Sequence, residues 1–141
     1  MSMIVNRRDL DFVLYETLGL DKILESERYA DYDRESLDAM LDLCQTIAED
    51  QFLTCASKLD ANEPQFIDGQ VETISELKEA IAAYQEAGLC ATAYDADIGG
   101  LQLPWMMDQA LNGMFVCANN PAHIYLFLTQ GVTNMLNVCG S

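Results

Sequence analysis

Residues 33–60, DRESLDAMLDLCQTIAEDQFLTCASKLD, decide the fold of this chain. Mostly apolar side chains recur there at intervals of three and four, which is the spacing of one face of an α-helix. That face consists of Leu37, Met40, Leu41, Cys44, Ile47, Ala48, Gln51, Phe52, Cys55 and Leu59, and the opposite face carries Glu35, Asp38, Asp42, Glu49 and Asp50. Asp33 precedes the run, where an aspartate can accept from the first free backbone N–H groups. The stretch therefore predicts a long amphipathic helix over 34–60.

Shorter helical patterns flank it. Residues 8–18 place Leu10, Val13, Leu14, Thr17 and Leu18 on one face and end at Gly19, and 22–32 read as a polar connection with some helical character. After a loop at 61–72, Thr73 and Glu76 have the spacing of a capping box for a helix over 74–87 that ends at Gly88. Further helices are expected from Pro104 to 118 and from Pro121 to 138, the latter interrupted at Gly131. No β-rich window is found, so we predict an all-α, up-and-down helical bundle.

Charge excludes several classes of function. The chain has 141 residues, with 23 acidic and 7 basic side chains and a net charge of −16. Nucleic-acid binding and docking on anionic membranes both require clustered Lys and Arg, so the acidic balance argues against both functions. Half of the residues are apolar, which is too many for a disordered chain. We expect no transmembrane segment, no secretory leader, reduced and buried cysteines, and a cytoplasmic location.

The charges end at Asp108. From 109 to 141 there is no Asp, Glu, Lys or Arg, and His123 is the one side chain that can carry a charge near neutral pH. A surface without charge is normally covered. We therefore expect this tail to pack in the domain's own core or against something outside this chain, which would make the chain incomplete or obligately partnered. The isolated chain is expected to self-associate or to expose apolar surface.

Few residues have the chemistry of a catalytic or metal centre. The five cysteines lack metal-ligand spacing, so no metal site is predicted. His123 is expected to be structural or pocket-lining rather than a general base, and Asp95 and Asp97 to form turns. The pair Gly99-Gly100 lacks a phosphate-loop pattern, but its backbone can take positive φ or approach a neighbour closely. The tail disperses uncharged polar groups among apolar ones, which is typical of a pocket wall and also of helix packing with satisfied amides.

The order of these elements resembles the N-terminal helical domain of the flavin-dependent acyl-CoA dehydrogenases. Ala87-Gly88-Leu89 followed by Gly99-Gly100-Leu101-Gln102-Leu103-Pro104 is similar to the family's junction between two helices. Leu128-Thr129-Gln130-Gly131 and the closing Gly140-Ser141 are similar to the run that leads to the family's β-domain. The opening residues 9–16 resemble the N-terminal extension of a larger subgroup. At Asp95 the chain departs from the family, which has proline there.

The resemblance implies a division into an extension, 1–32, and a domain, 33–141, with the β-domain and the C-terminal helical domain absent from this chain. It implies FAD and an acyl-CoA substrate in a full-length enzyme of fatty acid metabolism, which would be a homo-oligomer and an oxidoreductase. The glutamate that removes the α-proton would lie outside this chain. No catalytic residue is therefore assigned here, and the chain alone is expected to bind no flavin and to be inactive. Seven residues are expected to line the acyl pocket: Met114, Ala118, Asn119, Ala122, His123, Phe127 and Thr129.

Two alternatives remain open. The chain could be a non-catalytic helical interaction module that packs its uncharged C-terminal half on a partner chain. It could also be a stand-alone binder of a small molecule such as a long-chain acyl-CoA.

Overall fold

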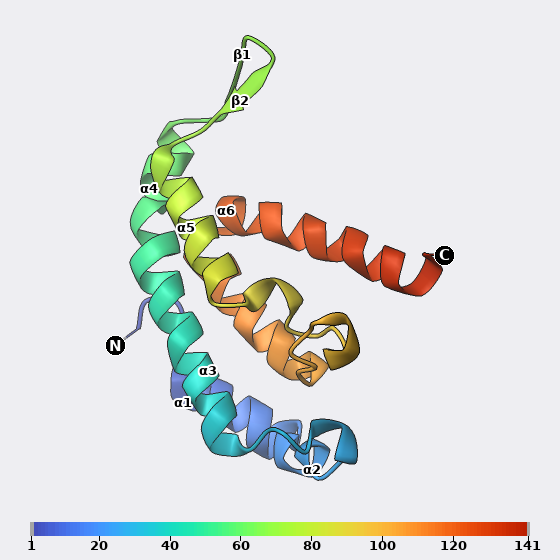
Figure 1. Ribbon diagram of the computed structural model, residues 1–141. Coiled ribbons are helices and arrows are strands. Elements are labelled where there is room, and N and C mark those ends of the chain that lie inside the picture. Colours follow the sequence, from blue (N-terminus) through green and yellow to red (C-terminus); the bar gives the residue numbers. More distant parts are fainter. Residues whose placement is uncertain (1, 141) are drawn as a thin grey trace.

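Helices make up most of the chain, which confirms the predicted all-α class (Figure 1). The computed structural model describes residues 2–140, so Met1 and Ser141 lie outside the described residues, and with them the last residue of the Gly140-Ser141 motif. The helices are α1 (Arg7–Asp11), α2 (Leu20–Leu24), α3 (Arg34–Ile47), α4 (Thr54–Ala61), α5 (Ser75–Glu86) and α6 (Trp105–Cys139). Two π-helical segments, η1 (Phe12–Thr17) and η3 (Ala48–Leu53), and three short 3₁₀ turns, η2 (Glu27–Tyr29), η4 (Leu89–Ala91) and η5 (Ala96–Ile98), join them.

The predicted long helix is present as α3, η3 and α4, which follow one another without a break. Asp33 caps it as expected: its carboxylate accepts from the backbone N–H of Ser36 at 2.8 Å. The Ser36 hydroxyl in turn accepts from the backbone N–H of Asp33 at 3.0 Å, which completes a reciprocal cap. Leu37, Leu41 and Cys44 are buried, so the predicted apolar face is the face that enters the core.

Three aromatic rings form the centre of the core. Phe52 of η3, Tyr84 of α5 and Phe115 of α6 meet edge to face, and the Phe115 ring centroid lies 4.9 Å from each of the other two. This arrangement joins the three longest helical segments at one point. The fully buried side chains of Leu37, Leu41 and Met107 extend the core toward the other end of the bundle.

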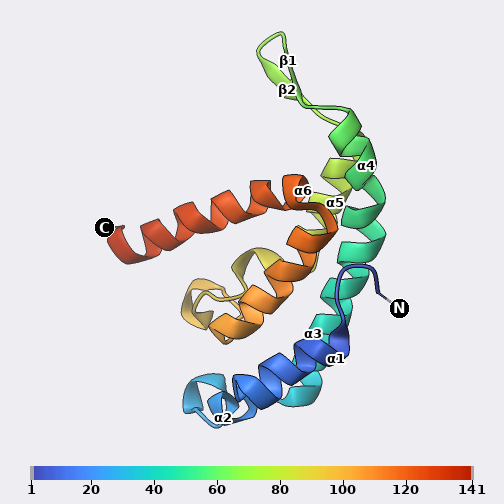
Figure 2. The ribbon, with the colours of Figure 1, turned by 180° about the vertical axis from the view of Figure 1, so that it is seen from behind.

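Helix α6 bends sharply at Asn119, which has φ −162° and ψ 85° inside an otherwise helical run. Pro121 accounts for the bend, because proline has no N–H to donate and its ring clashes with the carbonyl of the residue four positions earlier. We call 105–118 the first limb and 120–139 the second limb. The break predicted at 119–121 is confirmed, but the interruption predicted at Gly131 is wrong, since the second limb continues to Cys139. Figure 2 shows the second limb running away from the α3–α4 helix.

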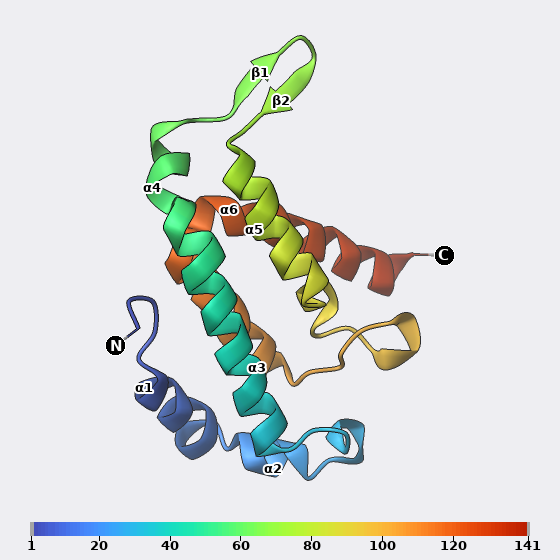
Figure 3. The ribbon, with the colours of Figure 1, turned by 60° about the vertical axis from the view of Figure 1, so that its left-hand side comes forward.

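The absence of strands was a wrong expectation. Strands β1 (Gln65–Ile67) and β2 (Gln70–Glu72) pair antiparallel and project beyond the ends of α4 and α5 (Figure 3). Asp68 and Gly69 form the two-residue turn with φ 50° and 83°, and the Asp-Gly pair is a strong signal for such a hairpin. The sequence predicts only a loop at 61–72, because the strands in it are three residues long.

Two further details differ from expectation. The predicted capping box at Thr73 does not form: α5 starts after Ile74, and Glu76 pairs with Lys58 instead. Near the N-terminus, Val13 and Leu18 are 44% and 48% exposed, while Tyr15 is buried beside Leu14. The π-helical turn of η1 holds an extra residue, which rotates these side chains away from the face that a regular α-helix would bury.

Candidate functional site

The angle between the two limbs of α6 encloses a cavity of about 310 Å³. Its third side is the segment 90–94 that follows α5, and the loop 89–103 lies in this angle in Figures 1 and 2. The lining residues are Cys90, Thr92, Ala93, Tyr94, Trp105, Asp108, Gln109, Asn112, Phe127, Gln130, Gly131 and Asn134. Three aromatic rings and one carboxylate stand among neutral groups, and no basic side chain is among them. Such a lining suits an apolar or neutral group better than a phosphate.

Backbone hydrogen bonds fix the loop that forms the third side. Leu103 N–H donates to the Thr92 carbonyl and Gln102 N–H to the Tyr94 carbonyl, both at 2.8 Å. Gly99 has φ 86°, and a Cβ on Gly100 would overlap the carbonyl of Tyr94. The expectation for the Gly-Gly pair is confirmed in both of its forms, a positive φ and a close approach. The loop therefore presents Tyr94 to the cavity in one defined position.

Asp108 is buried at the start of α6, with 4% of its surface exposed. One carboxylate oxygen accepts from the Thr92 hydroxyl, and the other accepts from Gln109 Nε2 at 2.9 Å. The first turn of a long helix also favours a negative group. Within 2–140 no Lys or Arg forms a salt bridge to this carboxylate, so neutral donors and the helix terminus alone stabilise it. Asp108 thereby ties the loop to the first limb.

A chain of side-chain hydrogen bonds joins the limbs behind the cavity. Asn112 Nδ2 donates to the Asp108 carbonyl at 3.0 Å, which leaves Asn112 Oδ1 as an acceptor. His123 Nε2 lies 3.0 Å from that oxygen and Tyr84 donates its hydroxyl to it at 3.3 Å. The imidazole is therefore the tautomer with its proton on Nε2. On the other side of the cavity, Tyr94 donates its hydroxyl to the Gln130 carbonyl at 3.0 Å.

His123 is surrounded as a core residue is, rather than as a catalytic base exposed to a substrate. Its ring lies parallel to Phe115, with 10° between the planes and 6.2 Å between the centroids, and 1% of the residue is exposed. Burial lowers the pKa of His123, while the nearby Asp108 carboxylate raises it by a smaller amount. Desolvation thus favours the neutral ring.

The seven residues predicted for the acyl pocket divide into two groups. Met114, Ala118, Asn119, Ala122 and His123 are buried by this chain's own helices. Phe127 is 55% exposed and lines the cavity. Thr129 is also exposed, and its hydroxyl donates to the Tyr125 carbonyl at 3.1 Å.

The sequence pattern did not indicate Tyr94, Trp105 or Asp108 as site residues. Asp108 carried a usable signal, because it is the last charged residue of the chain and opens an uncharged run. Tyr94 and Trp105 carried none, since only the loop and the bend in α6 bring them toward Phe127. Asn112, Gln130 and Asn134 line the cavity and belong to the uncharged polar groups of the tail, whose composition is typical of a pocket wall.

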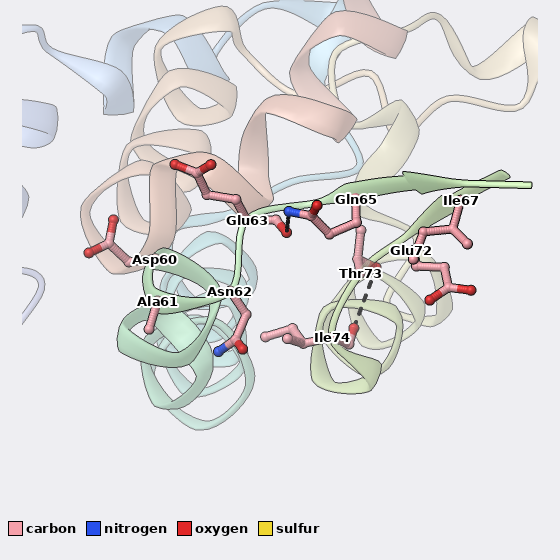
Figure 4. A pocket seen from close by; sticks show the side chains of 9 residues that line it. All are labelled: Asp60, Ala61, Asn62, Glu63, Gln65, Ile67, Glu72, Thr73 and Ile74. Atoms are coloured by element: carbon pink, nitrogen blue, oxygen red, sulfur yellow. Dashed lines mark hydrogen bonds between the residues drawn. The ribbon is translucent and has the colours of Figure 1, made fainter. Parts of the chain in front are cut away.

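A second hollow, of about 580 Å³, lies at the base of the hairpin between Asp60 and Ile74 (Figure 4). Its acidic side chains do not converge, since Glu72 lies on the opposite side from Asp60 and Glu63 in this view. Asn62 Nδ2 donates to the Lys58 carbonyl and Gln65 Nε2 to the Glu63 carbonyl, so these amides serve the local chain. The cavity in the angle of α6 is the better candidate site.

Three further sequence predictions concern metal binding, membrane spans and the cysteines. Over residues 2–140, no three His, Cys, Asp or Glu side chains come together in a way that could hold a metal ion. In the same part of the chain, no helix combines the length and the apolar character needed to cross a lipid bilayer. All five cysteines are free; Cys44 and Cys55 are buried as expected, but Cys90, Cys117 and Cys139 are exposed, which corrects the prediction that all are buried.

Comparison with known proteins supports a distant relationship to one enzyme. No protein-family model matches the chain. Over 123 residues it is 29% identical to the broad-specificity linear acyl-CoA dehydrogenase FadE5 of Mycobacterium tuberculosis. The match covers 85% of this chain and 20% of that enzyme, so the chain spans about a fifth of the length of this curated relative. The chain is thus distantly similar to an acyl-CoA dehydrogenase.

Proposed function

We propose that this chain is the N-terminal helical domain of a flavin-dependent acyl-CoA dehydrogenase and supplies part of the wall of its acyl pocket. The observation that carries the proposal is the cavity in the angle of α6, which is lined by aromatic and neutral side chains with Asp108 as its one carboxylate, and has no basic group. Acyl chains need such an apolar surface, with few polar groups to fix their orientation. The similarity to a linear acyl-CoA dehydrogenase supports the same substrate class.

In this proposal the pocket-wall residues act in two ways. Phe127 and Thr129, which are exposed, contact the acyl chain or its immediate neighbours. The five buried members, Met114 to His123, set the angle between the limbs and thereby the shape of the wall. Trp105 and Tyr94, which also line the cavity, join Phe127 as aromatic contacts.

The residues of this chain do not fit a whole FAD or the diphosphate of coenzyme A. Diphosphates require cations or clustered N–H donors, and Asp108 is the one charged group of the cavity. Four of the basic residues, Arg7, Arg28, Arg34 and Lys58, form ion pairs with acids elsewhere. We therefore propose that other parts of the enzyme hold the flavin and the catalytic base, and we assign no catalytic step to this chain.

The proposed division keeps 1–32 as an extension and 33–141 as the domain proper. Leu14 and Leu20 belong to the same core cluster as Leu37, so the extension is proposed to brace the domain. Arg28 supports this, because it pairs with Asp95 and its carbonyl accepts from Gln102 Nε2 at 2.7 Å. Through these contacts the extension would hold the loop that forms one side of the cavity.

The test uses the protein encoded by the whole reading frame that contains these residues. We expect the purified protein to carry FAD and to oxidise linear acyl-CoA thioesters to enoyl thioesters with an artificial electron acceptor. A protein that is folded by circular dichroism but carries no flavin, takes none up on incubation and oxidises no acyl-CoA would contradict the proposal.

One observation favours the second candidate function, a non-catalytic interaction module. The second limb exposes a row of large apolar side chains: Ile124, Tyr125, Phe127, Leu128, Val132, Met135, Leu136 and Val138. Exposed apolar patches of this kind commonly mark protein contacts. A flavin-free protein that forms a stable complex through this limb would favour the module over the enzyme.

A further inference from the structure

Asp108 is the one feature of the cavity that a plain acyl chain leaves unexplained. Its carboxylate is buried, with 4% of the residue exposed, in a wall that otherwise consists of aromatic and neutral groups. Buried charges in proteins are normally paired with an opposite charge, and a saturated chain packed against this wall would offer none. The lining therefore indicates a ligand that carries a group complementary to a carboxylate.

The described part of the chain does not compensate the charge of Asp108. Over residues 2–140 its carboxylate accepts from two neutral donors, the Thr92 hydroxyl and the Gln109 amide, and no Lys or Arg forms a salt bridge to it. Burial lowers the pKa of His123 and so favours the uncharged imidazole. A carboxylate offers about four lone pairs, so acceptor positions remain for a further donor. Both the charge and these positions favour a cation that carries N–H groups.

The aromatic rings of the same cavity suit the rest of such a ligand. Tyr94, Trp105 and Phe127 line it, and the face of an aromatic ring attracts an organic cation while it also packs against methylene groups. Trp105 and Phe127 are 62% and 55% exposed, whereas Asp108 is buried, so these two rings lie toward the opening and the carboxylate lies deeper. An alkyl chain that enters along the rings would reach the carboxylate with its far end.

We propose that this cavity binds an organic ammonium group, in the form of a protonated amine at the end of an alkyl chain. The ammonium donates to the Asp108 carboxylate, and the chain lies against the rings of Trp105 and Phe127. The volume of about 310 Å³ is within the range of small-molecule sites. An anion would be repelled by Asp108, and a metal ion would need further ligands, which the described residues 2–140 do not gather. The inference concerns the cavity alone and does not depend on the proposed dehydrogenase.

The first test compares two ligands that differ only in the end group. Trp105 is the only tryptophan of the chain, so its fluorescence reports on the cavity during a titration of the 141-residue protein. We expect hexylammonium to bind with a dissociation constant at least about tenfold lower than that of hexanol, because a charge-assisted hydrogen bond replaces a weaker one. Equal dissociation constants, or no binding of hexylammonium, would overturn the proposal.

Two pairs of variants locate the effect in the cavity. Asp108→Asn should abolish the preference for the amine, while Asp97→Asn, which removes an exposed acid from the same loop, should leave it unchanged. Equal losses would show that only the overall negative charge attracts the amine, and would overturn the proposal. Because Asp108 also holds the loop, a second pair leaves it intact. Phe127→Leu should weaken hexylammonium binding by about threefold, while Phe12→Leu, an exposed ring outside the cavity, should not. Equal effects of these two would exclude the role of the rings.

The whole protein distinguishes the two sources of such an amine. A lower KM for the ω-aminohexanoyl thioester than for the hexanoyl thioester would assign the ammonium to the acyl group. Inhibition of hexanoyl oxidation by hexylammonium, without that preference, would assign it to a free alkylamine, and the absence of both effects would overturn the proposal. The fluorescence titration needs neither flavin nor acyl-CoA. An inactive protein that still prefers the amine would therefore contradict the proposed enzyme function and leave this inference standing.

Discussion

His123 Nε2 lies 3.0 Å from Asn112 Oδ1, and this contact joins the two limbs of α6 across the bend at Asn119. Because Asn112 is held in turn by the Asp108 carbonyl and by the Tyr84 hydroxyl, the second limb is fastened to the first limb and to α5 together. The angle that encloses the cavity thus depends on a neutral histidine in the core.

Stability should therefore fall as the pH is lowered through the titration of His123. In the unfolded chain a histidine titrates near pH 6.5, and burial lowers the pKa in the folded state. Between these two values the unfolded state binds more protons, so the free energy of unfolding decreases as the pH falls from about 7 toward the folded-state pKa. Above about pH 7 the contribution of His123 is constant. Urea unfolding from about pH 5 to 8 measures this slope.

The matched variant is His123→Gln, which keeps an N–H donor near Asn112 and does not titrate in this range. Its free energy of unfolding should be independent of pH from about 5.5 to 7.5, above the titration of most carboxyl groups. A wild-type profile as flat as that of the variant would contradict the assigned role of His123.

Asn119→Ala should destabilise the fold by about 2–4 kcal/mol. Asn119 Oδ1 accepts from the backbone N–H of Ala122 at 3.1 Å and caps the second limb, while Asn119 Nδ2 donates to the Phe52 carbonyl at 3.0 Å. The variant loses both hydrogen bonds, and the buried Phe52 carbonyl loses the amide of Asn119 as a donor. Asn120→Ala, at an exposed neighbouring position, should change stability by less than about 0.5 kcal/mol. Equal losses in thermal or urea unfolding would exclude the proposed cap.

Gly100→Ala should cost more than about 2 kcal/mol, because the added methyl group would overlap the backbone of Tyr94. Gly131→Ala is the control, since nothing lies within 4 Å of a Cβ at that helical position. There alanine should stabilise the second limb by up to about 1 kcal/mol. Chemical denaturation of both variants checks the opposite signs, and a tolerated Gly100→Ala would show that the loop can move away from Tyr94.

The sequence was a good guide where one helix face decides the structure. The stripe from Leu37 to Leu59, the cap at Asp33 and the break before Pro121 were all predictable, because periodicity, capping and proline sterics act over a few residues. The hairpin at 65–72 was missed because its strands are too short to show alternation, although Asp68-Gly69 was a usable signal. The rotated face near Val13 was missed because a π-helical turn leaves no mark in the pattern of apolar residues.

The candidate site was harder to predict for a different reason. Of the seven residues expected to line a pocket, Phe127 borders the cavity, while five are buried in the core. An apolar helix facing a pocket and one facing a neighbouring helix have the same composition, so the sequence of the tail cannot separate them. The walls supplied by Tyr94 and Trp105 depend on the loop and on the angle of α6, which are properties of the whole fold.

The most direct test of the pocket wall measures how acyl-CoA oxidation depends on the length of the acyl chain. The measurement is made on the whole protein, for the wild type and for the Phe127→Asp variant. We expect the variant to raise KM by at least about tenfold for long linear acyl thioesters and much less for short ones, because a carboxylate in the apolar wall opposes burial of the chain. Asn120→Asp, an exposed substitution of the same charge at the start of the second limb, should leave the profile unchanged. Identical profiles for wild type and Phe127→Asp would contradict the claim that the angle of α6 forms the acyl pocket.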